Sequence, residues 1–196
     1  MVITAGPTRE AIDPVRYLSN HSSGKMGYAL AQAFAAAGAK VDLISGPVAL
    51  EPPQRVIVHQ ITSAVEMCDA ATKLAGDADF FIGAAAVADY RPAAIAGEKI
   101  KKQGGRELSL DLVENPDIVA TVAQLPNRPV IVAGFAAETH DLLSHARAKR
   151  LRKGLDMIIA NDVGAPETTF GSDQNAVHLI TAENETRLAL ASKYVI

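Results

Sequence analysis

Only one cysteine and no tryptophan occur among the 196 residues, and aromatic side chains make up 5% of the sequence. The single cysteine, Cys68, excludes disulfide bonds within the chain and fits a reducing compartment. Cys68 stands in an apolar helical context, which favours a small buried side chain over a nucleophile. Cysteine and histidine form no cluster with zinc-ligand spacing, so the sequence does not predict a structural zinc site.

Long apolar runs and an excess of positive charge are missing as well. No apolar stretch approaches the roughly eighteen residues of a membrane span, and the chain begins directly with a short apolar segment rather than a signal peptide. The net charge is −3, which argues against nucleic acid or an anionic membrane as the main partner. The sequence therefore indicates a cytoplasmic protein, and its 48% hydrophobic content is enough for the core of one domain.

Three sequence signatures of common nucleotide-dependent enzymes are also absent. G-x-G-x-x-G does not follow the first apolar segment, and G-x-x-x-x-G-K-[ST] does not occur. No tyrosine has a lysine four residues later, as a short-chain dehydrogenase would require. These absences weigh against an NAD(P)-dependent oxidoreductase and against a P-loop enzyme.

Strand-like and helix-like segments alternate along the chain. This alternation predicts a single nucleotide-binding α/β domain over residues 1–196, Rossmann-like, with a doubly wound, mostly parallel sheet and helices on both faces. The expected strands are residues 1–4, 41–45, 55–61, 79–83, 130–134 and 156–160, and a final hairpin is expected at 176–190. Helices are expected from residue 24, over 62–74 with Thr62 or Ser63 as cap, from Asn115, and before residue 153.

Small residues follow two of the expected strands. Gly83 to Ala86 come after the strand at 79–83, and Gly134 precedes Phe135 and Ala136 in the same way. Ligands of open α/β sheets bind at the carboxyl ends of strands, and small residues let them approach the backbone there. A long polar loop before the first helix, with Lys25 in that helix's first turn, is either helix capping or a phosphate seat.

Two further segments carry clustered charge. Residues 91–113 predict a β-hairpin arm with its turn at Gly104-Gly105, suited to dimerisation or to a lid, and its lysines are either a solvated edge or part of a site. In the segment 147–153, Lys149 and Lys153 share one helical face. Their charge either favours the helix terminus or faces a phosphate.

The motifs themselves resemble those of bacterial, CTP-dependent phosphopantothenoylcysteine synthetase, also called phosphopantothenate–cysteine ligase. They are AGPTRE, DPVRYLSNHSSGKMG, GAAAVADYR, EKIKK, NPDIV, GFAAET, RAKRLRKGLD and AND, in family order over about residues 1 to 180. In this family the domain is usually the C-terminal half of a bifunctional coenzyme A biosynthesis protein with an N-terminal flavin-dependent decarboxylase half. The resemblance also implies a final helix after Leu190, most of which is missing, so the domain looks truncated at its C-terminal end.

The resemblance implies a ligase reaction in two steps. The carboxylate of 4′-phosphopantothenate attacks the α-phosphate of CTP with release of pyrophosphate, and cysteine then displaces CMP from the acyl-cytidylate. Mg²⁺ is implied as cofactor, its protein ligands unknown. The arm itself favours a homodimer as the assembly. The nucleotide-binding residues that the resemblance implies are Gly83, Ala84, Ala85, Asp89, Lys99, Pro116, Asp117, Ile118, Val119, Phe135, Lys149 and Lys153.

Three residues receive roles in catalysis or substrate binding from the same resemblance. Asn20 would hold the acyl intermediate for attack by cysteine, Lys99 would stabilise charge during acyl transfer, and Arg16 would contact the substrate phosphate. Whether a partner protomer completes the site stays open. An NAD(P)-dependent oxidoreductase and a non-enzymatic nucleotide-binding domain remain the alternatives.

Overall fold

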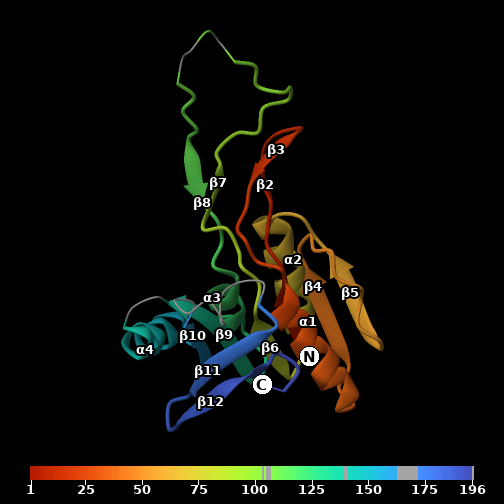
Figure 1. Ribbon diagram of the computed structural model, residues 1–196, viewed down its shortest axis with the longest axis vertical. Helices are drawn as coiled ribbons and strands as arrows, with labels where there is room; N and C mark the ends of the chain where they lie inside the picture. Colours follow the sequence, from red (N-terminus) through yellow and green to blue (C-terminus); the bar gives the residue numbers. More distant parts are fainter. Residues whose placement is uncertain (103, 105–106, 139–140, 163–171, 196) are drawn as a thin grey trace.

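An eight-stranded sheet forms the centre of the molecule (Figure 1). The computed structural model describes residues 1–102, 104, 107–138, 141–162 and 172–195, and over these residues the strand order is β12-β11-β10-β9-β6-β1-β4-β5. The bounds are β1 Val2–Ala5, β4 Val41–Ser45, β5 Val56–Gln60, β6 Phe80–Gly83, β9 Ile131–Glu138, β10 Met157–Asp162, β11 Gln174–Ile180 and β12 Glu185–Ser192. All neighbouring pairs from β10 to β5 are parallel, and β11 and β12 add an antiparallel edge.

Helices cover both faces of this sheet, so the expected fold class is confirmed. The bounds are α1 Lys25–Ala36, α2 Ala64–Ala75, α3 Ile118–Ala123 and α4 Leu142–Lys153. Tyr28 and Ala31 of α1 pack on one face with Ile3 and Leu43, whereas α2, α3 and α4 pack on the other. Ser63 caps α2 as expected, because its Oγ accepts a hydrogen bond from Glu66 N at 3.2 Å.

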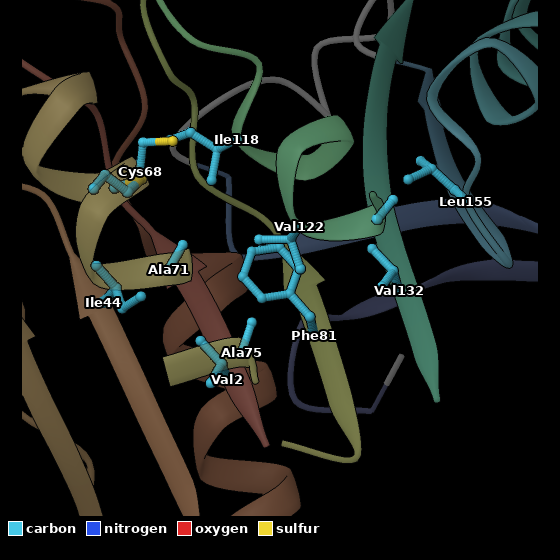
Figure 2. Packing of buried hydrophobic residues seen from close by; sticks show 12 residues of the cluster. Val2, Ile44, Cys68, Ala71, Ala75, Phe81, Ile118, Val122, Val132 and Leu155 are labelled. Carbon is cyan, nitrogen blue, oxygen red and sulfur yellow. The ribbon is translucent and has the colours of Figure 1, made fainter. Parts of the chain in front are cut away.

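One large part of the core lies between the sheet and helices α2 and α3. Figure 2 shows Phe81 of β6 beneath Val122 of α3, with Val2 and Ala75 close by. Cys68 belongs to this cluster and is buried, and burial raises the pKa of its thiol. The expectation of a small buried side chain at Cys68 is therefore confirmed.

The polar loop after β1 contains an antiparallel hairpin that the sequence reading did not predict. β2 spans Glu10–Asp13 and β3 spans Arg16–Leu18. The Asp13 Oδ1 atom accepts hydrogen bonds from Val15 N at 2.9 Å and Arg16 N at 3.0 Å, which closes the turn. Asp13-Pro14 is a sequence typical of a turn, but strands this short give no periodic signal.

The arm pairs only at its base, over β7 Tyr90–Pro92 and β8 Leu112–Glu114. The hairpin expected over residues 91–113 is therefore confirmed at its base but does not extend along the arm, because no strand lies between Pro92 and Leu112 in the described part of the arm. An isolated two-stranded ribbon has no sheet face to pack on and is marginal in water. Of the expected turn Gly104-Gly105, Gly105 lies outside the described residues.

Several element ends also differ from expectation. Asp117, not Asn115, caps α3, because Asp117 Oδ1 accepts from Ala120 N at 3.2 Å whereas the Asn115 amide donates to Ala88 O at 2.8 Å. The final hairpin is longer than expected, from Gln174 to Ser192. In the part of the chain that the structure describes, no helix is long and apolar enough to cross a membrane.

Candidate nucleotide-binding site

A pocket of about 800 Å³ opens where the small-residue loops after β6 and β9 meet the start of α1. The arm and the β2–β3 hairpin rise from this carboxyl edge of the sheet (Figure 1). Eleven of the twelve expected nucleotide-binding residues line the pocket, and Lys99 does not. The eleven are Gly83, Ala84, Ala85, Asp89, Pro116, Asp117, Ile118, Val119, Phe135, Lys149 and Lys153.

The end of β6 is shaped by close packing and by hydrogen bonds. A Cβ atom on Gly83 would lie 2.4 Å from Val119 Cγ2, so only glycine lets α3 approach the strand this closely. Ala84 N donates to Thr4 O at 3.2 Å, and Ala85 N donates to Thr4 Oγ1 at 3.2 Å. Among the described residues, nothing donates to the carbonyl oxygens of Ala84 and Ala85. This edge therefore offers a ligand the carbonyl oxygens of Ala84 and Ala85 as hydrogen-bond acceptors.

Cations line the side of the pocket formed by α4. Lys149 and Lys153 are one turn apart on the helix, and both line the pocket. Lys153 Nζ lies 2.8 Å from Asp117 Oδ2, while the other oxygen of Asp117 caps α3. The ion pair holds Lys153 against the start of α3, where its charge is available to an anion in the pocket.

Lys25 and Lys193 stand at the α1 end of the pocket, and both line it. Lys25 Nζ lies 2.6 Å from Asp173 Oδ1, and this contact lowers the pKa of Asp173. The Lys193 side chain is buried, and its Nζ donates to the Ser172 carbonyl. Burial lowers the pKa of Lys193, the charge of Lys25 lowers it further, and Asp173 opposes both effects.

Asparagine side chains supply neutral polar groups near this end. Asn175 is buried beside the sulfur of Met26, with its Nδ2 3.9 Å from Sδ. Asn161, at the end of β10, lines the pocket, and its Oδ1 has no hydrogen-bond partner among the described residues. The sequence reading assigned no role to Lys193, Asn161 or Asn175. The available signal for Lys193 was its position directly after the mostly apolar end of the last strand, where a lysine is unusual and indicates a special role.

Asn20, Arg16 and Lys99 do not line the pocket. Asn20 reaches its wall from behind, since Nδ2 donates to the Ala86 carbonyl and Oδ1 accepts from Ser22 N at 3.2 Å. Arg16 forms an ion pair with Asp13, and its Nη2 donates to Ile100 O at 2.8 Å. Lys99 is exposed on the arm. The structure thus brings the nucleotide residues together but keeps Lys99 and Arg16 apart from them.

Asp13 ties the arm to the hairpin. Its side chain is fully buried, and its Oδ2 accepts from Arg16 Nε at 3.0 Å and from Ile100 N at 3.1 Å. These hydrogen bonds, with Arg16 the largest contributor, hold the pKa of Asp13 well below its usual range. Ala96 N also donates to Ile12 O at 3.0 Å. The arm base is therefore fixed on both sides of Lys99.

Metal ligands are not gathered anywhere in the described part of the chain, where no three His, Cys, Asp or Glu side chains form a possible metal cluster. The pocket carboxylates Asp89 and Asp117 could contribute one ligand each to an ion held mainly by phosphates. The described residues therefore do not build a metal cage of their own.

A family model described as the DNA/pantothenate metabolism flavoprotein C-terminal domain matches residues 1–196. The chain belongs to this family. A Vibrio vulnificus relative of this domain, named as the coenzyme A biosynthesis bifunctional protein CoaBC, is 54% identical over 198 residues, all of this chain and 49% of the relative. The protein of the same name from Escherichia coli K12 is 52% identical, with the same coverage. The chain thus spans about half the length of the curated relatives it matches.

A solved structure from the same family has the same fold as this chain. The crystal structure of the C-terminal domain of a CoaBC protein matches with a TM-score of 0.82 and 37% identity, covering 99% of this chain and 87% of that one. The resemblance drawn from the motifs is therefore confirmed at the level of the family.

Proposed function

We propose that this chain joins 4′-phosphopantothenate to cysteine at the expense of CTP, giving phosphopantothenoylcysteine, CMP and pyrophosphate in coenzyme A biosynthesis. Family membership and the motif order support the reaction class. The observation that carries the proposal is the pocket itself, because residues from β6, α3, β9 and α4 that the resemblance assigns to the nucleotide line one cavity.

The base and ribose of CTP are assigned to the strand-end side of the pocket. Cytosine carries an exocyclic amine, which is a hydrogen-bond donor and needs an acceptor. The carbonyl groups of Ala84 and Ala85 provide acceptors there, and Phe135 lines the same pocket. Asp89 is exposed at the rim of the pocket, where a ribose hydroxyl can donate to its carboxylate.

The first step joins two anions and therefore needs fixed positive charge. A carboxylate oxygen of the acid attacks the α-phosphorus, a new C(O)–O–P link forms, and the bond to the β-phosphate breaks with release of pyrophosphate. Lys149, Lys153 and Lys25 line the pocket from two different helices. Cations already in place stabilise the charge that builds up on the transferring group without reorganisation during the step.

The second step forms the amide bond. The cysteine amine attacks the acyl carbon, loses a proton, and CMP leaves with the electrons of the broken C–O bond. Asn20 is assigned to hold the mixed anhydride. Its hydrogen bonds to Ala86 and Ser22, which both line the pocket, fix it directly behind the pocket wall. Lys99, which is carried by the arm, is assigned to charge stabilisation during acyl transfer. Arg16 is assigned to the substrate phosphate, and it would have to leave its ion pair with Asp13 to bind that phosphate.

Mg²⁺ and the assembly complete the proposal. Mg²⁺ would enter with the phosphates of CTP, with Asp89 or Asp117 as candidate ligands, and would supply charge neutralisation. Exposed apolar side chains on the arm favour a homodimer through this element; they are Ile95, Leu108, Leu110, Leu112 and Val113. The chain covers about half of its curated relatives, and we propose the flavin-dependent decarboxylase half that the resemblance implies as the covalent partner of this domain.

Pyrophosphate release tests the proposal. The purified chain, given CTP, 4′-phosphopantothenate and cysteine, is expected to release pyrophosphate and to form phosphopantothenoylcysteine in equal amounts. CTP binding without turnover would favour a nucleotide-binding domain without catalysis. Binding of NADPH with a spectral change would favour the oxidoreductase.

Asn20→Asp separates the two steps. This variant is expected to bind CTP and release some pyrophosphate while forming product slowly. Ser19→Ala is the matched control, since Ser19 Oγ also ties this loop, to Thr8 O at 2.7 Å. Equal loss of both steps in Asn20→Asp would contradict the assigned role.

Lys99→Gln is expected to reduce turnover without lowering the melting temperature, because Lys99 is exposed.

A further inference from the structure

Lys193 is a buried cation whose place in the pocket has no assigned purpose. It follows the last residue of β12, and only 9% of its surface is exposed. Its backbone N donates to Asp173 O at 2.9 Å, and its Nζ donates to the Ser172 carbonyl. These bonds hold the ammonium at the pocket wall, so its position does not depend on a flexible side chain in solvent.

The charge around Lys193 is not balanced by a carboxylate in direct contact. Among the described residues, no Asp or Glu lies within ion-pair distance of Lys193 Nζ. The carboxylate that stabilises its charge, Asp173, is bonded to Lys25 instead and is 85% exposed. Asp173 is thus in contact with one ammonium group and near the other, and the second of these, Lys193, is buried. A buried ammonium destabilises a fold unless an anion compensates it.

We propose that Lys193 and Lys25 together form a phosphate-binding subsite, and that Asp173 occupies Lys25 until the phosphate arrives. This assignment rests on the proposed function for the identity of the ligand but not for its chemistry. The hydroxyl-bearing residues Ser22 and Ser23 line the same end of the pocket, beside the first turn of α1. Ammonium groups, hydroxyls and helix N–H groups are the donors that bind phosphate oxygens in proteins. The phosphate can come from the polyphosphate tail of CTP or from 4′-phosphopantothenate.

Lys193→Met changes stability and binding in opposite directions. The folded protein lowers the pKa of Lys193, so at neutral pH its charge is less favourable in the folded than in the unfolded chain. Replacing it with an apolar side chain is expected to leave the melting temperature unchanged or higher, while phosphate binding falls. A lysine with a merely structural role would lower both. Lys193→Arg keeps the charge and is expected to retain most of the phosphate affinity.

Asp173→Asn provides a second, independent test, the direction in which phosphate affinity changes. Removing the carboxylate that competes for Lys25 is expected to tighten phosphate binding several-fold when divalent metal is removed by a chelator. If Asp173 served the ligand directly or through a metal ion, the same change would weaken binding instead. The direction of this effect distinguishes a competing carboxylate from a ligand.

Isothermal titration of the whole chain with pyrophosphate, CMP, CTP, 4′-phosphopantothenate and pantothenate tests the subsite. Lys193→Met is expected to weaken pyrophosphate binding by about tenfold, the loss of one charge-assisted contact. A matching loss of affinity for CTP but not for CMP assigns the subsite to the β- and γ-phosphates of the nucleotide. A loss for 4′-phosphopantothenate but not pantothenate assigns it to the acid. Lys73→Met, an exposed lysine of α2, is the control and is expected to change none of these affinities.

The possible failures are distinguishable. Affinities in Lys193→Met equal to those of Lys73→Met, weaker binding in Asp173→Asn, or no binding of any phosphate compound to the unaltered chain would overturn the subsite. Lack of ligase turnover alongside Lys193-dependent pyrophosphate binding would overturn the proposed function and leave the subsite standing. Ligase turnover by the unaltered chain, together with unchanged phosphate affinities in Lys193→Met, would overturn the subsite and leave the proposed function standing.

Discussion

The pocket edge and the arm differ in how their residues are held. At the edge, Gly46 and Gly83 leave no room for a Cβ atom, and Thr4 and Thr8 use their side chains to accept N–H groups from the loop after β6. In the arm, Gly97 has open space around it, and Ile95 is 64% exposed. The edge is built to keep one geometry before any ligand binds, whereas the arm offers surface for another molecule or segment to cover.

Paired glycine substitutions give the largest contrast between the two regions. In Gly46→Ala the new Cβ would lie 1.8 Å from the Pro7 carbonyl oxygen, a backbone atom that no rotamer change can move. We expect a loss of about 3 kcal/mol in the free energy of unfolding, measured by urea titration. Gly97→Ala has no neighbour within 4 Å and is expected to change this free energy by less than about 1 kcal/mol. Equal losses would show that the edge is not rigid.

Lysine substitutions sharpen the contrast at the level of binding. Lys153→Met removes a pocket cation and its ion pair with Asp117, and we expect CTP affinity to fall by about tenfold in isothermal titration. Lys101→Met in the exposed arm is the control, expected to leave CTP affinity unchanged. If Lys101→Met weakened binding as much as Lys153→Met, the nucleotide would not be confined to the pocket.

Asp13→Asn is expected to release the arm base without breaking the hairpin turn. An amide can keep the Oδ1 contacts to Val15 and Arg16, but its NH₂ group would face the Ile100 N–H. We expect exchange of the Ile100 amide proton, followed by NMR, to rise by about tenfold. Asp42→Asn breaks a carboxylate contact on β4, to His59 at 2.7 Å, and is expected to leave this exchange rate unchanged.

The pH dependence of the same variant has a definite sign. The pKa of Asp13 is lowered on folding, so its ionised form contributes stability above its unfolded value near pH 4, and that contribution is lost as pH falls further. The difference in unfolding free energy between the unaltered chain and Asp13→Asn should therefore be constant from pH 7 to about 5 and shrink below about pH 4. A difference that grows in acid would contradict the structure around Asp13.

The smallest effect on the folded chain is expected from Leu108→Glu. Leu108 is 58% exposed on the arm, so the free energy of unfolding at low protein concentration should change by less than about 0.5 kcal/mol. Sedimentation should nevertheless show a shift from dimer to monomer, because a charge is placed in the proposed interface. Val130→Glu, at a residue 76% exposed, is the control and should leave the assembly unchanged.

Much of the sheet was predictable because it consists of buried runs with clear ends. A strand is expected over residues 79–83, and β6 spans Phe80–Gly83. The gathering of Pro116 to Val119 with Lys149 and Lys153 came from the resemblance. Spacing alone does not show that helices α3 and α4 meet at one pocket.

The remainder depends on contacts distant in sequence. Lys193 reaches the pocket only because β12 pairs with β11 and β11 with β10, an arrangement without a local signal. The Asp13 contact with Ile100 joins residues 87 positions apart and is also invisible in the pattern. The exposed place of Lys99 fits the solvated alternative for the arm lysines, although the strands expected around it do not form.

A single-turnover reaction with CTP labelled at the α-phosphate, together with 4′-phosphopantothenate and without cysteine, tests the central claim most directly. The account predicts that the label appears in an acyl-cytidylate while pyrophosphate is released, and that added cysteine converts this compound to CMP and product. Label that stays in CTP until cysteine is added would contradict the account.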